Sequence, residues 1–379
     1  MEREELASWL RLALTPGIGD AAGRKLLAAF GLPSQVFEAS RDALLQVVTP
    51  AQAQALQQVP DGLAAQLERT VEWLQGQAAD GSTRRIVTLG DPGYPAPLLA
   101  TDDPPLMLYL LGAPAFELAQ AGRSIAMVGS RNPSAQGEQT ARSFARAFGE
   151  AGITVVSGLA LGIDGAAHAG ALEAAGAPDR LATVAVVGTG LDRVYPARHR
   201  ELAHRIAAQG LIVSEFPLGT PPLTQNFPKR NRIIAGLSRG TLVVEAALRS
   251  GSLITARLAA EQGRDVFAIP GSIHSPHSRG CHALIRQGAK LVESVADVLE
   301  DLQLGAPATA ALPAAPAEAD PPEDAGLLAA LGFDPVSLDA LCARTGYGAA
   351  QLQAQLLELE LEGRVARLPG GLFQRIARG

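Results

Sequence analysis

The stretch Ser124-Ile-Ala-Met-Val-Gly-Ser-Arg-Asn-Pro-Ser134 decides the fold of this chain. Residues 125–128 form a short apolar run, and Gly129 and Ser130 follow it before a helical pattern begins near Gln136. A continuously apolar strand that leads through glycine into a helix is typical of a parallel sheet buried on both faces. We therefore expect this strand to end in a loop at the edge of such a sheet.

The same strand-then-helix pattern continues through the middle of the chain. Further apolar, β-branched runs lie at residues 153–156, 183–187, 211–213, 241–244 and 266–269. Helical stretches rich in alanine and leucine separate them, at residues 136–150, 165–174, 200–208 and 254–262. The pattern predicts an α/β fold with a Rossmann-like, doubly wound, mostly parallel sheet.

Changes in composition divide the chain into four segments. We expect a helical domain of the helix-hairpin-helix or SAM type at 1–78, the Rossmann-like domain at 79–302, an Ala/Pro-rich linker at 303–325 and a winged-helix domain at 326–379. The linker is nearly all Ala, Pro, Gly, Asp and Glu, a composition that cannot bury a core. The last segment has the order helix, turn, helix and hairpin, which is typical of a winged helix.

The turn Pro16-Gly-Ile-Gly19 joins the first two helical stretches. In a helix-hairpin-helix motif, such glycines would let backbone amides approach a DNA phosphate. A tight turn between two helices needs the same glycines for its backbone angles. We favour the tight turn, because the segment shows one such hairpin and its flanks are acidic.

Composition disfavours several classes of protein. With 32 basic and 38 acidic side chains, the net charge of −6 speaks against a protein that coats nucleic acid non-specifically. Two cysteines cannot build a disulfide framework. The first residues do not form a basic, apolar leader, and no apolar run reaches the ~18 residues that a membrane helix needs. We expect a cytoplasmic protein without a membrane partner.

The ten residues Phe227-Pro-Lys-Arg-Asn-Arg-Ile-Ile-Ala-Gly236 hold the most informative group of charges. Lys229, Arg230 and Arg232 put three cations within four positions, ahead of an apolar run that is strand-like or helix-like. Residues 195–239 carry seven Lys or Arg against two acids, in a chain whose net charge is −6. Several fixed cations beside an apolar element predict an anion site, above all for phosphate, free or in a nucleic-acid backbone.

Glycine- and hydroxyl-rich loops follow the predicted strands, at the sheet edge where ligands of such folds bind. We expect Arg131 and the turn at Ser157 and Gly158 to converge there with the three cations. The loops match neither the Gly-x-Gly-x-x-Gly dinucleotide pattern nor the Gly-Lys-Ser/Thr of a P-loop. We therefore expect no nucleotide cofactor.

Two other groups of residues suggest chemistry less strongly. Asp164 and His168 could form an acid–base pair, but a helix N-cap with a histidine on the same face explains their spacing better. Zinc-ligand residue types also gather in one segment: His274, His277, Cys281 and His282. This segment lacks a second ligand pair. We expect no metal and no catalytic residue, and hence binding rather than turnover.

Eight motifs occur in an order that is typical of one family. They are Val128-Gly-Ser-Arg131, Ser157-Gly-Leu-Ala-x-Gly-Ile-Asp-x-x-Ala-His168, Gly190-Leu-Asp-x-x-Tyr-Pro196, Ser214-Glu-x-Pro217, Phe227-Pro-x-Arg-Asn-Arg-Ile-Ile-Ala-Gly-Leu-Ser238, Val244-Glu-Ala246, Ser250-Gly-Ser-Leu-Ile-Thr-Ala256 and Val266-Phe-Ala-Ile-Pro-Gly271. The chain resembles the DNA-processing protein DprA, also called Smf, over about residues 84–296, and the flanking pieces fit that family's three-part layout. One local departure is His282, which stands where Asn is common.

The resemblance implies a dimeric protein of natural transformation and competence that is not an enzyme. Members of the family bind single-stranded DNA, protect it and load the RecA recombinase onto it for homologous recombination. Carried over to this chain, the phosphate contacts fall to Arg131, Lys229, Arg230 and Arg232. The residues that would line the same pocket are Gly129, Ser130, Ser157, Gly158 and Asn231. Aromatic residues are only 4% of the chain, so we expect phosphate contacts to outweigh base stacking.

Two other functions are open to the same sequence. The first is a nucleotide phosphoribohydrolase of the lysine-decarboxylase-like Rossmann group, whose Pro-Gly-Gly-x-Gly-Thr-x-x-Glu motif is matched only by Pro270-Gly-Ser272. The second is a transcription regulator that uses the winged helix. Its second helix, at residues 351–362, carries three glutamates and no Lys or Arg, so that face would repel a DNA duplex.

Overall fold

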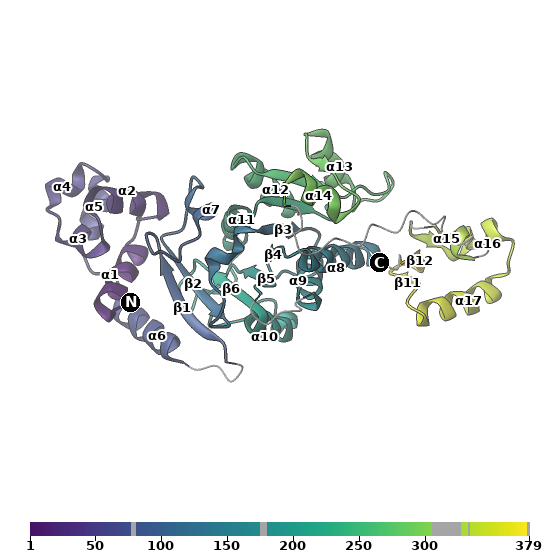
Figure 1. Ribbon diagram of the computed structural model, residues 1–379, viewed down its shortest axis with the longest axis horizontal. Coiled ribbons are helices and arrows are strands. Elements are labelled where there is room, and N and C mark those ends of the chain that lie inside the picture. Colours follow the sequence, from purple (N-terminus) through teal and green to yellow (C-terminus); the bar gives the residue numbers. More distant parts are fainter. Residues whose placement is uncertain (77–80, 175–179, 305–326, 333, 377–379) are drawn as a thin grey trace.

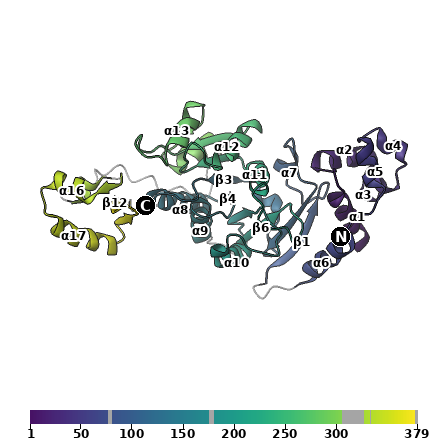
Figure 2. The same cartoon turned by 180° about the vertical axis from the view of Figure 1, so that it is seen from behind.

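A computed structural model describes residues 1–76, 81–174, 180–304, 327–332 and 334–376. The molecule is elongated, with a helical unit at one end, a large sheet in the middle and a small C-terminal unit at the other end (Figures 1 and 2). Most of the linker predicted at 303–325 lies outside the described residues. Among the described helices, none combines the length and the apolar character needed to cross a membrane.

The central sheet has nine strands in the described residues, in the order β1-β2-β6-β5-β4-β3-β7-β8-β9. Strands β3 to β9 are mutually parallel, whereas β1 and β2 add an antiparallel edge beside β6. The strand bounds are β1 (Thr83–Thr88), β2 (Met107–Gly112), β3 (Ser124–Val128), β4 (Thr154–Ser157), β5 (Thr183–Val186), β6 (Gly210–Ser214), β7 (Gly240–Val243), β8 (Asp265–Ala268) and β9 (Lys290–Leu291). The α/β prediction with a mostly parallel sheet is confirmed.

The chain reverses its direction across the sheet between β3 and β7. It runs outward from β3 through β4 and β5 to β6, then crosses back to lay β7 on the other side of β3. Ala126 pairs with Thr241 and Val128 with Val243 at this point. In open α/β sheets, such a switch point leaves a crevice at the carboxyl ends of the strands.

Helices cover both faces of the sheet, as the alternation of side chains along β3 shows. Ile125 and Met127 face a core shared with α8 (Ala135–Glu150) and α9 (Ile163–Glu173). Ala126 and Val128 face the opposite core, with α11 (Asn226–Leu237) and α12 (Ser252–Glu261). The other helices of this region are α7 (Ala96–Leu99), α10 (Arg200–Gln209), α13 (Arg279–Arg286) and α14 (Val295–Asp301). Strands β3 to β7 are therefore buried on both faces, which explains their continuous apolar runs.

The N-terminal helices share a hydrophobic core with the antiparallel edge of the sheet. They are α1 (Arg3–Leu14), α2 (Asp20–Phe30), α3 (Pro33–Glu38), α4 (Arg41–Leu45), α5 (Pro50–Leu56) and α6 (Leu63–Gln75). Trp73 on α6 meets Tyr109 on β2 edge to face, with ring centroids 5.9 Å apart. The helical unit is thus packed onto the sheet through buried aromatic side chains.

The C-terminal unit has its own small core and its own sheet. Its elements are α15 (Leu327–Leu331), β10 (Val336–Ser337), α16 (Leu338–Thr345), α17 (Ala349–Leu361), β11 (Val365–Leu368) and β12 (Leu372–Arg375). Leu341, Leu352, Leu356 and Phe373 are among its buried side chains. The predicted order of helix, turn, helix and hairpin is present, preceded by the short α15.

Replacing Gly170 with Ala should destabilise the fold. Helices α8 and α9 approach so closely that a Cβ atom at position 170 would lie 2.1 Å from the backbone oxygen of Arg142. Alanine favours an isolated helix, but overpacking against backbone costs about 1–3 kcal/mol. We expect a lower urea midpoint of unfolding. Gly122→Ala is the matched control, because no atom lies within 4 Å of its added Cβ; equal midpoints for the two variants would contradict the close contact.

Candidate functional site

The loop after β3 is held firmly at the carboxyl edge of the sheet. Ser130 donates its backbone N–H to the carbonyl oxygen of Glu245 (2.8 Å) and accepts a hydrogen bond from the Ile163 amide at its own carbonyl (3.1 Å). A Cβ atom at Gly129 would lie 2.6 Å from the Ile163 side chain and 2.9 Å from the Glu245 backbone oxygen, so the close packing requires glycine there. The loop is rigid, and it presents the exposed side chain of Arg131.

The polar groups at the end of β4 form hydrogen bonds within the protein. The buried Ser157 hydroxyl donates to the carbonyl oxygen of Met127 (2.6 Å). The carbonyl oxygen of Gly158 accepts a hydrogen bond from the Arg230 guanidinium, and a Cβ at position 158 would lie 2.2 Å from that group. These two residues therefore shape the edge of the sheet, and their polar groups already have partners within the fold.

Helix geometry separates Arg230 from the other two predicted cations. Residues 226–237 form α11, and at about 100° per residue Lys229 and Arg232 share one face while Arg230 points elsewhere. Phe227 lies on the face opposite Lys229. The prediction that the three cations form one cluster is wrong, because neighbours in sequence diverge around a helix.

The buried side chain of Arg230 links α11 to the sheet through hydrogen bonds. Its guanidinium donates to the carbonyl oxygens of Gly158 and Val186, at the ends of β4 and β5, and its Nε donates to Asn231 Oδ1 (3.1 Å). The Asp164 carboxylate lies 4.0 Å away. Burial lowers the pKa of Arg230 to about 10, although Asp164 acts to raise it, so the side chain stays charged at neutral pH. Its donors are occupied inside the protein.

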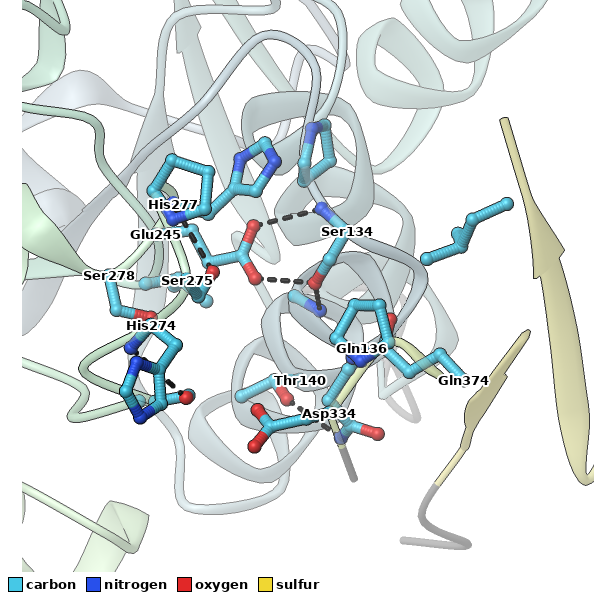
Figure 3. A pocket seen from close by; sticks show the side chains of 18 of the residues that line it. Ser134, Gln136, Thr140, Glu245, His274, Ser275, His277, Ser278, Asp334 and Gln374 are labelled. Atoms are coloured by element: carbon cyan, nitrogen blue, oxygen red, sulfur yellow. Dashed lines mark hydrogen bonds between the residues drawn. The ribbon is translucent and has the colours of Figure 1, made fainter. Parts of the chain in front are cut away.

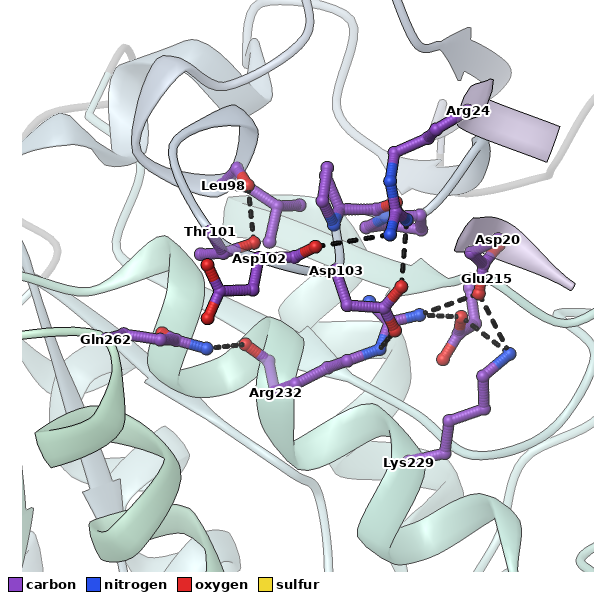
Figure 4. A network of polar contacts seen from close by, with 12 residues as sticks. Asp20, Arg24, Leu98, Thr101, Asp102, Asp103, Glu215, Lys229, Arg232 and Gln262 are labelled. Atoms are coloured by element: carbon purple, nitrogen blue, oxygen red, sulfur yellow. Dashed lines mark hydrogen bonds and ion pairs between the residues drawn. The ribbon is translucent and has the colours of Figure 1, made fainter. Parts of the chain in front are cut away.

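Arg232 and Lys229 belong to a network of ion pairs that reaches the N-terminal helices (Figure 4). Arg232 lies 3.1 Å from Asp20 on α2 and 3.1 Å from Asp103, and it also pairs with Glu215. Lys229 Nζ lies 3.2 Å from Asp20 and 3.1 Å from Glu215. The acidic partners thus offset both cations, and Arg232 is buried. The predicted phosphate contact by Arg232 would have to break these pairs.

The pKa shifts in this network agree with its geometry. Burial raises the pKa of Glu215, although Arg232 and Lys229 act to lower it. Burial acts to lower the pKa of Lys229, but Glu215 and Asp20 outweigh it and the net shift is upward. Lys229 therefore keeps its charge, and its side chain is 47% exposed, more than that of any other member of the Asp20 and Glu215 pairs.

An exposed cation and two aromatic rings meet at the mouth of the site. The guanidinium carbon of Arg131 lies 5.5 Å from the ring centroid of Phe227. The ring centroid of Tyr195 lies 5.6 Å from that of Phe227. The three residues come from the loop after β3, the loop after β5 and the start of α11. We call them the Arg131–Phe227–Tyr195 cluster. Tyr195 was not among the predicted site residues, because it lies 32 positions from Phe227 in sequence.

Asp164 and His168 have separate roles in the structure. Asp164 Oδ2 accepts a hydrogen bond from the Ala160 amide (3.2 Å), near the start of α9. His168 is fully buried and its Nδ1 lies 2.7 Å from the Thr183 hydroxyl. Burial, together with nearby His199 and Arg230, lowers the pKa of His168 to about 3. The two residues are not paired with each other, but the predicted N-cap role of Asp164 is wrong, because α9 begins at Ile163 after Gly162 and Asp164 lies within its first turn.

The side chain of Glu245, which follows β7, is directed toward Ser134 (Figure 3). Its carboxylate accepts hydrogen bonds from the Ser134 amide (2.9 Å) and the Ser134 hydroxyl (2.5 Å), at the start of α8. A Cβ at Gly137 would lie 2.2 Å from this carboxyl group. A helix start of this kind holds phosphate in nucleotide-binding sheets. Here an internal carboxylate takes that place, which explains why the loop lacks a nucleotide motif.

A cavity of about 880 Å³ lies beside Glu245, and the segment with His274 and His277 lines it. Cys281 is buried against the carbonyl oxygens of Val243 and Val244, and His282 Nε2 lies 3.0 Å from the Gly271 carbonyl oxygen. Within the described part of the chain, no group of three or more His, Cys, Asp or Glu side chains is arranged to hold a metal ion.

Comparison with known proteins agrees with this architecture. A family model described as DNA recombination-mediator protein A matches residues 85–303, and one described as the DprA winged helix domain matches residues 310–371. This chain belongs to the DNA recombination-mediator protein A family. Protein Smf of Escherichia coli (strain K12) is 47% identical over 295 residues, which are 75% of each chain. The predicted DprA (Smf) resemblance and the winged helix are thereby confirmed.

Two solved structures of the family resemble this one. DNA processing protein A from Streptococcus pneumoniae superposes with a TM-score of 0.64 and 36% identity, over 79% of this chain and 98% of that one. The Helicobacter pylori protein gives a TM-score of 0.51 and 29% identity, over 58% and 96%. In this family member, the Arg131–Phe227–Tyr195 cluster and Lys229 are accessible, whereas the Arg230 and Arg232 side chains are buried.

Replacing His168 with Asn should make the fold less sensitive to acid. The pKa of His168 is about 3 in the fold and about 6.5 in an unfolded chain, so between these values the unfolded state binds the extra proton. The contribution of neutral His168 to the free energy of unfolding is therefore fully present above pH 6.5 and is lost as the pH falls toward 3. In the unchanged chain, we expect protonation of unfolded His168 to lower the free energy of unfolding by about 2 kcal/mol between pH 7.5 and 5. His168→Asn should not show this loss. Urea unfolding at both pH values measures the difference.

The control for this experiment is His204→Asn, which changes an exposed histidine on α10. Its loss of stability between the two pH values should equal that of the unchanged chain. If His168→Asn also lost as much stability as the unchanged chain, the buried histidine would not be the source of the acid sensitivity.

Proposed function

We propose that this protein binds single-stranded DNA at the carboxyl edge of its sheet, without catalysing a reaction. The observation that carries the proposal is the Arg131–Phe227–Tyr195 cluster. Proteins that bind single strands combine cations for the phosphates with aromatic rings on which bases stack. The H. pylori relative is described by its single-stranded DNA binding mode, which supports the same ligand class here.

Within this proposal, the predicted site residues have different tasks. Arg131 makes the main phosphate contact, and the half-exposed Lys229 makes a second contact on the other face of α11. Gly129, Ser130, Ser157, Gly158 and Asn231 shape the edge on which the strand lies. Arg230 and Arg232 act as positioning residues, because their guanidinium groups are bonded within the protein.

The cellular role that we propose follows from family membership. The protein would protect incoming single strands in the cytoplasm during natural transformation and load the RecA recombinase onto them as a homodimer. The domain division at residues 78, 302 and 325 belongs to the same proposal. RecA filament formation on single strands coated with single-strand-binding protein, with and without this protein, tests the loading step. The phosphoribohydrolase alternative is not favoured, because the chain belongs to a different family.

Replacing Arg131 with Ala should weaken binding to single-stranded DNA and reduce its dependence on salt. Losing one charge-assisted phosphate contact corresponds to about 10- to 100-fold in affinity. The slope of log K against log salt should become less steep by about 0.7, the value for one phosphate on a single strand. Fluorescence anisotropy with a labelled oligonucleotide at several salt concentrations measures both. Arg146→Ala, which removes an exposed arginine of α8, should change neither; unchanged binding by Arg131→Ala would exclude the assignment.

Replacing Phe227 with Leu should weaken binding without changing the salt slope. A base stacked on an aromatic ring contributes about 1–3 kcal/mol, and leucine keeps the apolar volume but not the flat ring. We expect roughly a 5- to 100-fold loss of affinity at every salt concentration. The control is Phe144→Leu, in the core beneath α8, which should leave affinity unchanged. An altered salt slope for Phe227→Leu would indicate that the ring acts only by holding Arg131.

A further inference from the structure

Helix α17 of the C-terminal unit has two apolar faces. Leu352 and Leu356 are buried in the core of the unit, and Leu359 packs against that core. At about 100° per residue, four other apolar residues fall within about 60° of one another on the opposite side. They are Ala350, Ala354, Leu357 and Leu361, which we call the outer stripe. Leu357 is 57% exposed and Leu361 is 82% exposed.

The outer stripe differs from the single apolar side chains that are common on protein surfaces. A helix that packs on a single core needs one apolar side, and its other side is normally polar. Here the repeat at positions 350, 354, 357 and 361 has the spacing of a helix-pairing seam. Helix α17 lies in the end of the molecule farthest from α1–α5, so those helices do not cover the stripe (Figures 1 and 2).

Glutamates flank the outer stripe on both sides. Glu358 and Glu362 lie on one flank and Glu360 on the other, all exposed, while Ala349–Leu361 contains no Lys or Arg. Arg364 pairs with Glu362 at 3.6 Å, just beyond the helix. In a DNA-binding winged helix, the second helix enters the major groove. An apolar stripe between acids cannot do so, because the phosphates would repel it.

We propose that the outer stripe of α17 docks an amphipathic helix of a partner protein, one whose own apolar stripe is flanked by Lys or Arg. The apolar residues would supply affinity, and the glutamates would select a basic partner and set its register. A second copy of this chain fits less well, because pairing two α17 helices would bring together two sets of three glutamates. This inference is independent of the single-strand site, since it uses none of its residues.

The test uses the full chain and synthetic helical peptides of equal length. One peptide has a leucine stripe flanked by lysines, a second has the same stripe flanked by glutamates, and a third has the composition of the first with the stripe scrambled. We expect the first peptide to bind at least about tenfold more tightly than either of the others. Leu357→Ser/Leu361→Ser should weaken that binding at least about tenfold, because two leucines lose their burial.

Controls separate docking from other effects. Both leucines are exposed, so the double variant should keep the thermal midpoint and the single-stranded DNA affinity of the unchanged chain. The matched control is Leu248→Ser/Leu291→Ser, two exposed leucines outside α17, which should bind the first peptide normally. Equal binding of the first and third peptides would overturn the proposal by showing charge attraction alone. A dimer that dissociates only in Leu357→Ser/Leu361→Ser would overturn it in favour of a second copy.

Discussion

The buried guanidinium of Arg230 is the interaction on which the geometry of the site depends. Carbonyl groups at the ends of β4 and β5 need donors, and a charged group inside a protein needs acceptors. Gly158 and Val186 meet both needs at once. The same bonds fix the first turns of α11 against the sheet. That placement brings the Phe227 ring into contact with both Arg131 and Tyr195, which come from two other loops.

A second set of charges joins the N-terminal helices to α11. Lys229 and Arg232 come from α11, whereas Asp20 comes from α2 and Asp103 from the loop before β2. The excess of positive charge in residues 195–239 is therefore reduced in space by acids from elsewhere in the chain. Arg131, which belongs to a different loop, and the half-exposed Lys229 are the accessible cations of the candidate site. Two cations of the positive region seen in sequence, Arg230 and Arg232, are thus buried and structural.

Much of the fold could be predicted, because strands buried on both faces leave a strong apolar signal. The parallel strands β3 to β8 and helices α8, α9, α10 and α12 follow that signal closely. The antiparallel edge was missed, because β1 carries two arginines among its six residues and lacks the strand-then-helix pattern. For the site, Arg131 is exposed at a strand end as predicted, but the grouping of Arg230 with Lys229 and Arg232 ignored the helical twist. Tyr195 and Asp20 could not be placed without the tertiary structure.

The pairing of Asp20 with Lys229 and Arg232 has a consequence for the N-terminal helices. These helices supply one carboxylate of the network, Asp20, and one cation, Arg24, which pairs with Asp103, so they take part in its electrostatics as well as its packing. A sheet domain cut away from residues 1–78 would leave Lys229 and Arg232 without one of their carboxylate partners. Through Asp20, the helical unit thus competes with any incoming anion for Lys229 and Arg232.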